Sequence, residues 1–113
     1  MPLRKAYTLT IGTETFAVDC TKINQSGNAT IQPNTYNIWG EVTSLTITKG
    51  AEMPDVTNLY CIRFVAGEGC AITFDGFTLN WHGGSVPTWN AGSTYEINIV
   101  DNLALWAEFT PAS

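Results

Sequence analysis

The chain has 113 residues, the length of a single domain, and its five lysines and arginines are outnumbered by ten aspartates and glutamates. The resulting formal charge of −5 excludes nucleic-acid binding, which needs clustered cations to neutralise phosphates, and it disfavours anionic membrane surfaces. Charged residues make up 13% of the chain and apolar residues 44%. A chain this apolar is not expected to be disordered, and the low charge is typical of all-β proteins.

Apolar and polar residues alternate with a period of two along most of the chain, which predicts β-strands. Two strands are expected near the N-terminus, at Tyr7–Ile11 and Thr15–Cys20, with a turn at Gly12-Thr13 between them. The polar stretch Lys22–Pro33 is predicted to be a loop or an irregular strand, broken at Ser26-Gly27-Asn28. No apolar segment is long enough to span a bilayer, and no secretory signal is recognisable, so we expect synthesis in a cytoplasm with reduced cysteines.

The middle of the chain predicts four strands, at Tyr36–Trp39, Val42–Lys49, Leu59–Val65 and Cys70–Phe74. Gly40-Glu41 is expected to bend or bulge the backbone between the first two, and residues 66–69 to turn the last two into a hairpin. In that hairpin Cys61 and Cys70 lie roughly 13 Å apart along the ladder. A disulfide needs Cα atoms within roughly 7 Å, so both cysteines are predicted to be free thiols.

The C-terminal third predicts a strand at Phe77–Trp81, a loop from His82, and a hairpin of Tyr95–Val100 and Leu103–Phe109. Asp101-Asn102 joins the hairpin strands, because both residues tolerate the left-handed conformation that a two-residue turn requires. The pattern predicts about eight to nine strands in one domain over residues 1–113. We therefore expect an all-β fold, an antiparallel β-sandwich of jelly-roll-like form.

Catalytic and metal-binding motifs are not recognisable in the sequence. His82 is the only histidine and lies beside two glycines, without a nucleophile motif nearby. The three cysteines match no zinc-ligand spacing, and no two carboxylates form a calcium-loop motif. A carboxylate pair for glycosidic cleavage, assembled from distant strands, stays open. The interpretation that the residues favour is a protein without enzymatic activity or cofactor.

Tryptophans on either side of the glycine-rich loop are candidates for binding. Trp81 and Trp89 flank this loop, with His82 and Asn90 beside them. An indole can stack on a sugar face while neighbouring amides bond its hydroxyls, which makes these four residues a candidate glycan or partner contact. The alternative is that both indoles pack against the end of the fold or between subunits.

The Leu59–Phe74 region carries apolar residues on both predicted faces. One face fills the core, so the other is expected to meet a second sheet, a subunit or another surface. Tyr60, Ile62 and Phe64 are the candidate oligomer interface. Because the edge strands carry few lysines or prolines to block pairing, oligomerisation is expected.

Two segments resemble small β-rich bacteriophage virion proteins, which include tail-fibre, head-fibre and capsid-decoration components. Residues 31–47, IQPNTYNIWGEVTSLTI, are similar to the segment PNTxYxFGEVxSLTI of these proteins. Residues 77–109 are similar to their C-terminal pattern lpxxVxWxxGxxPTxxAGxxYEIsIxxxxAxWxxF. With the strands between them, the resemblance covers residues 29–109, while residues 1–28 hold N-terminal strands or an attachment segment.

The resemblance implies a structural protein on the virion surface, made in the bacterial host cytoplasm, commonly as a homotrimer and without catalytic residues. Its implied partners are further copies of itself, other virion proteins such as capsid or fibre, and host-surface glycans. In longer relatives this module lies at the C-terminal end of a larger fibre chain, whereas here about thirty residues precede it. That difference favours a self-contained knob or decoration protein.

Overall fold

The computed structural model describes the backbone of residues 4–11 and 14–110, and the side chains from residue 21 to residue 110. These residues form strands and no helix, so the expected all-β class is confirmed. The strands are β1 (Arg4–Ile11), β2 (Glu14–Asn24), β3 (Ala29–Ile31), β4 (Thr35–Lys49), β5 (Leu59–Asp75), β6 (Asn80–Trp81), β7 (Thr94–Val100) and β8 (Leu103–Phe109). The turn expected at Gly12-Thr13 lies outside the described residues. Among those that are described, no helix is long and apolar enough to cross a membrane.

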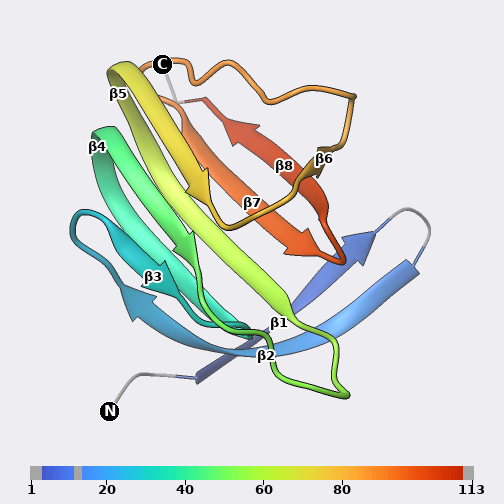
Figure 1. Cartoon of the computed structure of the whole chain (residues 1–113). Helices are drawn as coiled ribbons and strands as arrows, with labels where there is room; N and C mark the ends of the chain where they lie inside the picture. The colour runs from blue at the N-terminus through green and yellow to red at the C-terminus, as the bar shows by residue number, and fades with distance from the viewer. Residues whose placement is uncertain (1–3, 12–13, 111–113) are drawn as a thin grey trace.

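The strands form one mixed sheet in the order β1-β2-β4-β5-β7-β8-β6, with β3 paired to β4 beside β2 (Figure 1). The β1–β2, β5–β7 and β7–β8 pairs are antiparallel. The β2–β4, β3–β4, β4–β5 and β6–β8 pairs are parallel. The expectation of a wholly antiparallel sheet is therefore corrected.

The two longest strands, β4 and β5, bend back on themselves. In Figure 1 each rises to a corner and returns, so that its second half faces its first. Tyr60 gives the evidence, because its backbone pairs with Thr35 at the start of β4 while its hydroxyl donates to the carbonyl of Gly50, just past the end of β4, at 2.9 Å. A straight strand of this length would separate those two ends by roughly 50 Å. The bend brings both ends of β4 to one tyrosine.

Each strand makes the bend with its own irregularity. The β4–β5 register shifts between Ile38 and Glu41, which confirms the bulge expected at Gly40-Glu41. It shifts again opposite residues 67–70 of β5, where the sequence predicted a hairpin turn. That prediction is wrong: residues 59–75 form one strand, because the chain turns a corner with its neighbour β4 and does not pair with itself.

The neighbouring segment follows the same corner. Gln25–Asn28 separates β2 from β3, where the sequence predicted a break, and both strands pair with the same edge of β4. The indole of Trp39 donates to the carbonyl of Gly27 at 2.7 Å, and the side chain of Asn28 accepts from the amide of Thr46 at 2.8 Å. These two bonds connect the gap in the outer strand to β4 on both sides of its bulge.

The bend also explains how parallel neighbours are joined by a short link. Parallel strands normally need a crossover of a dozen or more residues, usually a helix. Here β4 returns to its own starting point, so the segment between Lys49 and Leu59 is sufficient. Asn34 sets the pairing of β5 at its start: it adopts φ 60° and bonds both backbone groups of Leu59, through its amide (2.6 Å) and its side-chain oxygen (3.2 Å). The turn at Pro33-Asn34-Thr35 thus places β4 beside β5.

The core fills the space between the two halves of the bent sheet. It contains Tyr60, Ile62 and Phe64, which are at most 2% exposed. Ile72 and Phe74, from the other half of β5, pack against the same cluster. The three residues predicted as an oligomer interface are therefore corrected to core residues, because the bend covers them with the chain's own second layer. Other buried members of the cluster are Ile31, Trp39, Leu45, Ile47, Ala66, Tyr95, Ile97, Ile99 and Ala104.

We call the first halves of β4 and β5, together with β7 and β8, the first layer. A second apolar cluster lies on the face of this layer that points away from the core. It consists of Tyr36, Leu59, Cys61 and Val100, with Ile38 packed against them. The two apolar faces predicted for the Leu59–Phe74 region, which is β5, thus correspond to two separate clusters. Cys61 is buried here, Cys70 lies nine positions later at the corner of the same strand, and neither forms a disulfide.

The last hairpin is confirmed as predicted. Val100 pairs with Leu103 across Asp101 and Asn102, whose φ angles of 48° and 64° are left-handed. The strand predicted at Phe77–Trp81 is shorter in the structure. Only Asn80–Trp81 forms a strand, which pairs with the start of β8.

Gly50 is expected to be intolerant of a side chain, because a Cβ there would lie 2.5 Å from the carbonyl oxygen of Ile31. The amide of Gly50 also donates to that oxygen at 2.8 Å, so neither group can move away without losing the bond. Gly50→Ala should lower the free energy of unfolding by about 2 kcal/mol or more, because the added methyl group would overlap a backbone oxygen that is held in place.

Gly40→Ala is the matched control, because a Cβ there would have no neighbour within 4 Å. It should change stability by less than about 1 kcal/mol in either direction. Urea denaturation of both variants measures the difference, and equal stabilities would contradict the described closure of the bend.

Candidate functional site

Aromatic residues gather at the end of the fold formed by β6, β8 and the loop between β6 and β7. Trp89 makes edge contacts with Phe64 and Tyr95, at ring-centroid distances of 5.3 and 5.0 Å, and lies 6.2 Å from Trp81. Trp81 in turn contacts Phe74 edge-on at 5.4 Å. The structure therefore brings the two predicted tryptophans together, and it packs both half-buried against the core.

The loop that carries Trp89 is fixed by one buried hydroxyl. The hydroxyl of Tyr95 accepts from the amide of Asn90 at 2.6 Å and donates to the carbonyl of Thr88 at 3.0 Å. Burial raises the pKa of this phenol, so it keeps its proton, and the donated bond, through the physiological range. The Asn90 side chain then donates to Glu108 on β8 at 3.1 Å. These bonds hold the loop over the aromatic cluster.

The polar residues of this end lie outside the rings. The His82 side chain is exposed, while its amide donates to the carbonyl of Ala104 (2.9 Å) and its own carbonyl accepts from the indole of Trp106 (3.3 Å). We call His82, Asn90 and Glu108, around the half-buried Trp81 and Trp106, the aromatic rim. Such a rim has the composition of a sugar-contacting surface, with ring edges beside hydrogen-bonding groups.

Sequence reasoning found Trp81, His82, Trp89 and Asn90 but missed Glu108 and Trp106. The predicted hairpin contained the information needed to place them. A two-residue turn at Asp101-Asn102 sets a register in which Glu108 lies opposite Tyr95. The same register, followed back along the strand to Thr94, places both Trp106 and Glu108 at the end of the fold that carries the tryptophans.

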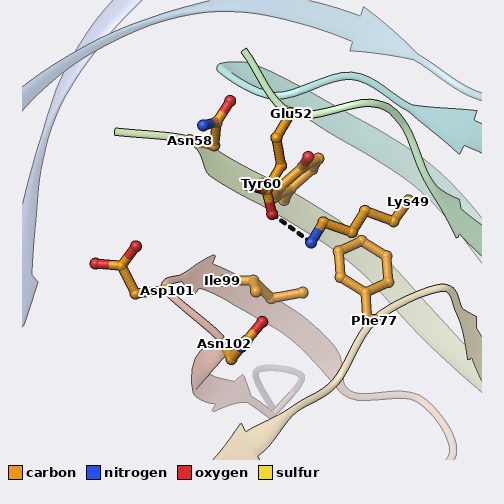
Figure 2. Close-up of a pocket in the computed structure, with 8 residues that line it drawn as sticks. All are labelled: Lys49, Glu52, Asn58, Tyr60, Phe77, Ile99, Asp101 and Asn102. Carbon is orange, nitrogen blue, oxygen red and sulfur yellow. Dashed lines mark hydrogen bonds and ion pairs between the residues drawn. The ribbon is translucent and has the colours of Figure 1, made fainter. Parts of the chain in front are cut away.

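A pocket lies at the other end of the core, below the return of β4. It is lined by Lys49, Glu52, Asn58, Tyr60, Phe77, Ile99, Asp101 and Asn102 (Figure 2). Lys49 forms an ion pair with Glu52, and its ammonium lies 5.9 and 6.0 Å from the ring centroids of Tyr60 and Phe77. The cation thereby joins the end of β4 to the segments packed over the core.

The size of this pocket limits what it can bind. Its volume of about 40 Å³ is enough for a few water molecules, whereas small-molecule sites occupy roughly 300–1,000 Å³. Several of its polar side chains already have partners: Glu52 pairs with Lys49, and Asn58 bonds the backbone of Met53 and Val56. We assign it a structural role.

A third polar group lies on the outer face of the first layer. The hydroxyl of Tyr36 donates to Glu96 and accepts from Arg63 at 3.5 Å, and Arg63 lies 4.0 Å from Glu96. The hydrogen bond to Tyr36 raises the pKa of the Arg63 guanidinium, and burial raises that of Tyr36. These side chains join β4, β5 and β7 across the sheet, next to the second apolar cluster. Among the described residues, no three histidine, cysteine or acidic side chains come close enough to hold a metal ion.

No protein-family model matches the chain, and neither a curated protein nor a solved structure matches it.

Tyr95→Phe should release the loop while preserving the ring that packs against Phe64. The substitution removes the bonds to Thr88 and Asn90, and loss of a buried hydroxyl with two partners costs about 1–3 kcal/mol. We expect lower stability to urea and faster amide exchange at Asn90. Unchanged exchange at Asn90 would show that the hydroxyl does not hold the loop.

The hydrogen bond that Asn90 donates lowers the pKa of Glu108. The folded pKa lies below the unfolded one, so this contribution to stability is present above the unfolded pKa and is lost as pH falls through the folded value. Asn90→Ala should raise the pKa of Glu108 in a carboxyl-carbon NMR titration. An identical titration curve in wild type and variant would rule out the described bond.

Proposed function

We propose that this protein is a non-enzymatic structural protein of a bacteriophage particle. It lies on the virion surface, as a capsid-decoration or head-fibre protein or as the knob of a fibre tip, and it associates with further copies of itself. Its partners are other virion proteins, and it needs no cofactor. The resemblance of residues 31–47 and 77–109 to phage virion proteins implies this role.

The observation that carries the proposal is where the resembling residues lie in the fold. Pro33-Asn34-Thr35 makes the turn that binds Leu59, and Gly40-Glu41 lies in the bulge of β4. The C-terminal pattern ends in the β7–β8 hairpin. The residues that resemble phage virion proteins thus lie in a bend, a turn and a hairpin. We expect this if what the proteins have in common is a fold that assembles into a particle. The resemblance also implies three copies per assembly.

The fold description that we propose with this function is a jelly-roll-like β-sandwich. Its support is the common core between the two halves of β4 and β5, with Leu45 and Ile47 of one half packed in the same cluster as Ile62 and Phe64 of the other. Small sandwiches of this kind expose loops at their ends and strand edges at their sides, both of which serve assembly.

The location of the chain in purified particles tests the proposal. Density-gradient-purified virions of the phage that encodes the chain should contain it by mass spectrometry, and immunogold labelling should place it on the head surface or at a fibre tip. Neighbouring genes should encode capsid or tail proteins. Its absence from purified particles, with abundant protein in the lysate, would overturn the proposal.

Glycan binding is the second candidate function, and the aromatic rim favours it. Trp81, Trp106 and Glu108 stay half-buried beside the exposed His82 and Asn90, so rings and polar groups are presented on one surface. A glycan array followed by tryptophan-fluorescence titration tests this, with His82→Ala as the variant because that exposed side chain can be removed without opening the core. A blank array with no sugar-dependent fluorescence change would exclude glycan binding.

A further inference from the structure

Strand β8 forms an edge of the sheet that is only partly covered. One side of β8 pairs with β7 along its whole length. On the other side, β6 pairs with Leu103 and Ala104, and no strand in the described part of the chain continues beyond that point. Residues 105–109 therefore present a free strand edge, and Ala107 is at its centre.

The backbone groups on this edge follow from the hairpin register. Val100 and Leu103 close a two-residue turn and so form a hydrogen-bonded pair, and such pairs alternate with non-bonded ones along an antiparallel ladder. Ala104, Trp106 and Glu108 consequently direct their amides and carbonyls away from β7. The bond from the amide of His82 to the carbonyl of Ala104 agrees with this alternation. Trp106 and Glu108 are left with outward-directed groups that a further strand can bond.

The side chains along the same edge make an apolar stripe on the outer face of the sheet. Leu103 and Phe109 are 45% and 51% exposed, Ala107 is exposed and Leu105 is half-buried between them. β8 carries no lysine or proline, the residues that commonly block pairing at strand edges. The stripe and the free backbone groups lie side by side on one strand.

We propose that β8 of one copy pairs antiparallel with β8 of a second copy, about a twofold axis at Ala107. This inference rests on the proposed function in one respect, self-association, and it names the surface that carries it. In this register Trp106 faces Glu108 of the second copy, and the two exchange backbone hydrogen bonds in both directions. Leu105 faces Phe109 of the second copy on the apolar side, and Ala107 faces its own counterpart.

A second copy fits this edge better than an unrelated strand, because the edge is complementary to itself. The free segment is symmetric about Ala107, so twofold pairing uses all of it and ends where β6 begins. Glu108 faces an indole and not another carboxylate, which avoids like charges directly opposite one another. An isologous contact of this kind gives an even number of copies, whereas the resemblance implies three.

Charge variants at Ala107 test the pairing. Ala107→Lys and Ala107→Glu alter an exposed side chain, so each should keep a near wild-type melting temperature. The wild type should approach twice the 12.3 kDa mass of one chain in sedimentation experiments as its concentration rises. Each variant alone should weaken the dimer about fivefold or more, because like charges face each other at the axis. An equal mixture of the two should restore it.

Cysteine crosslinking supplies a second measurement that does not depend on charge. A non-hydrogen-bonded antiparallel pair places Cα atoms about 4.5 Å apart, within disulfide range. Ala107→Cys should therefore form covalent dimers under mild oxidation. Thr30→Cys, exposed on β3, and the wild type with its native cysteines should not.

A trimer that is insensitive to both charge variants would overturn the β8 pairing and leave the proposed function standing. Failure of the mixture to restore association would do the same, since only a twofold contact places residue 107 opposite itself. A monomer at every concentration, with no Ala107→Cys crosslink, overturns the pairing as well. The proposed virion role fails separately, if the chain is absent from purified particles.

Discussion

The fold depends on the parallel pairing of β4 with β5, maintained through a corner that both strands turn together. Each strand supplies both layers around the core, so the backbone ladder itself connects the two layers. Tyr60 shows the closure most directly, since it pairs with the start of β4 and bonds the carbonyl just beyond its end. Because the corner is shared, an irregularity in one strand needs a matching one in its neighbour. The bulge at Gly40-Glu41 and the longer excursion at residues 67–70 meet this requirement.

The same bend positions the surfaces discussed for function. Folding β5 over brings Phe74 to Trp81 and Phe64 to Trp89, so the two tryptophans that flank the loop between β6 and β7 rest on both halves of one strand. The far end of the core is closed by Lys49, above Tyr60 and Phe77. The β7–β8 hairpin completes the first layer and leaves β8 at its margin. The aromatic rim and the β8 edge therefore adjoin, because Trp106 and Glu108 belong to both.

Strand alternation and turn chemistry were enough to predict the β class, the final hairpin and the bulge in β4. Asp101-Asn102 is a strong signal because few residues adopt left-handed φ angles in succession. The corner in β5 was mistaken for a hairpin, since Ala66-Gly67-Glu68-Gly69 has the composition of either. What distinguishes the two is the neighbouring strand, whose bulge lies about 25 residues earlier in the sequence and gives no local sign of its partner. Tyr60, Ile62 and Phe64 were assigned to an interface for the same reason: without the bend, no second layer covers them. At the candidate site, Trp81 and Trp89 were recognised from the loop they flank, but their contacts with Phe64 and Tyr95 arise from tertiary packing alone.

Backbone NMR contacts across β5 test the central claim most directly. The bent parallel pair predicts nuclear Overhauser effects between the strands at Tyr36 and Cys61 before the corner, and at Leu45 and Ile72 after it. Both sets should appear in one folded species. Cross-strand effects joining Val65 to Cys70 and Cys61 to Phe74, in place of those to β4, would show an antiparallel hairpin and contradict the account.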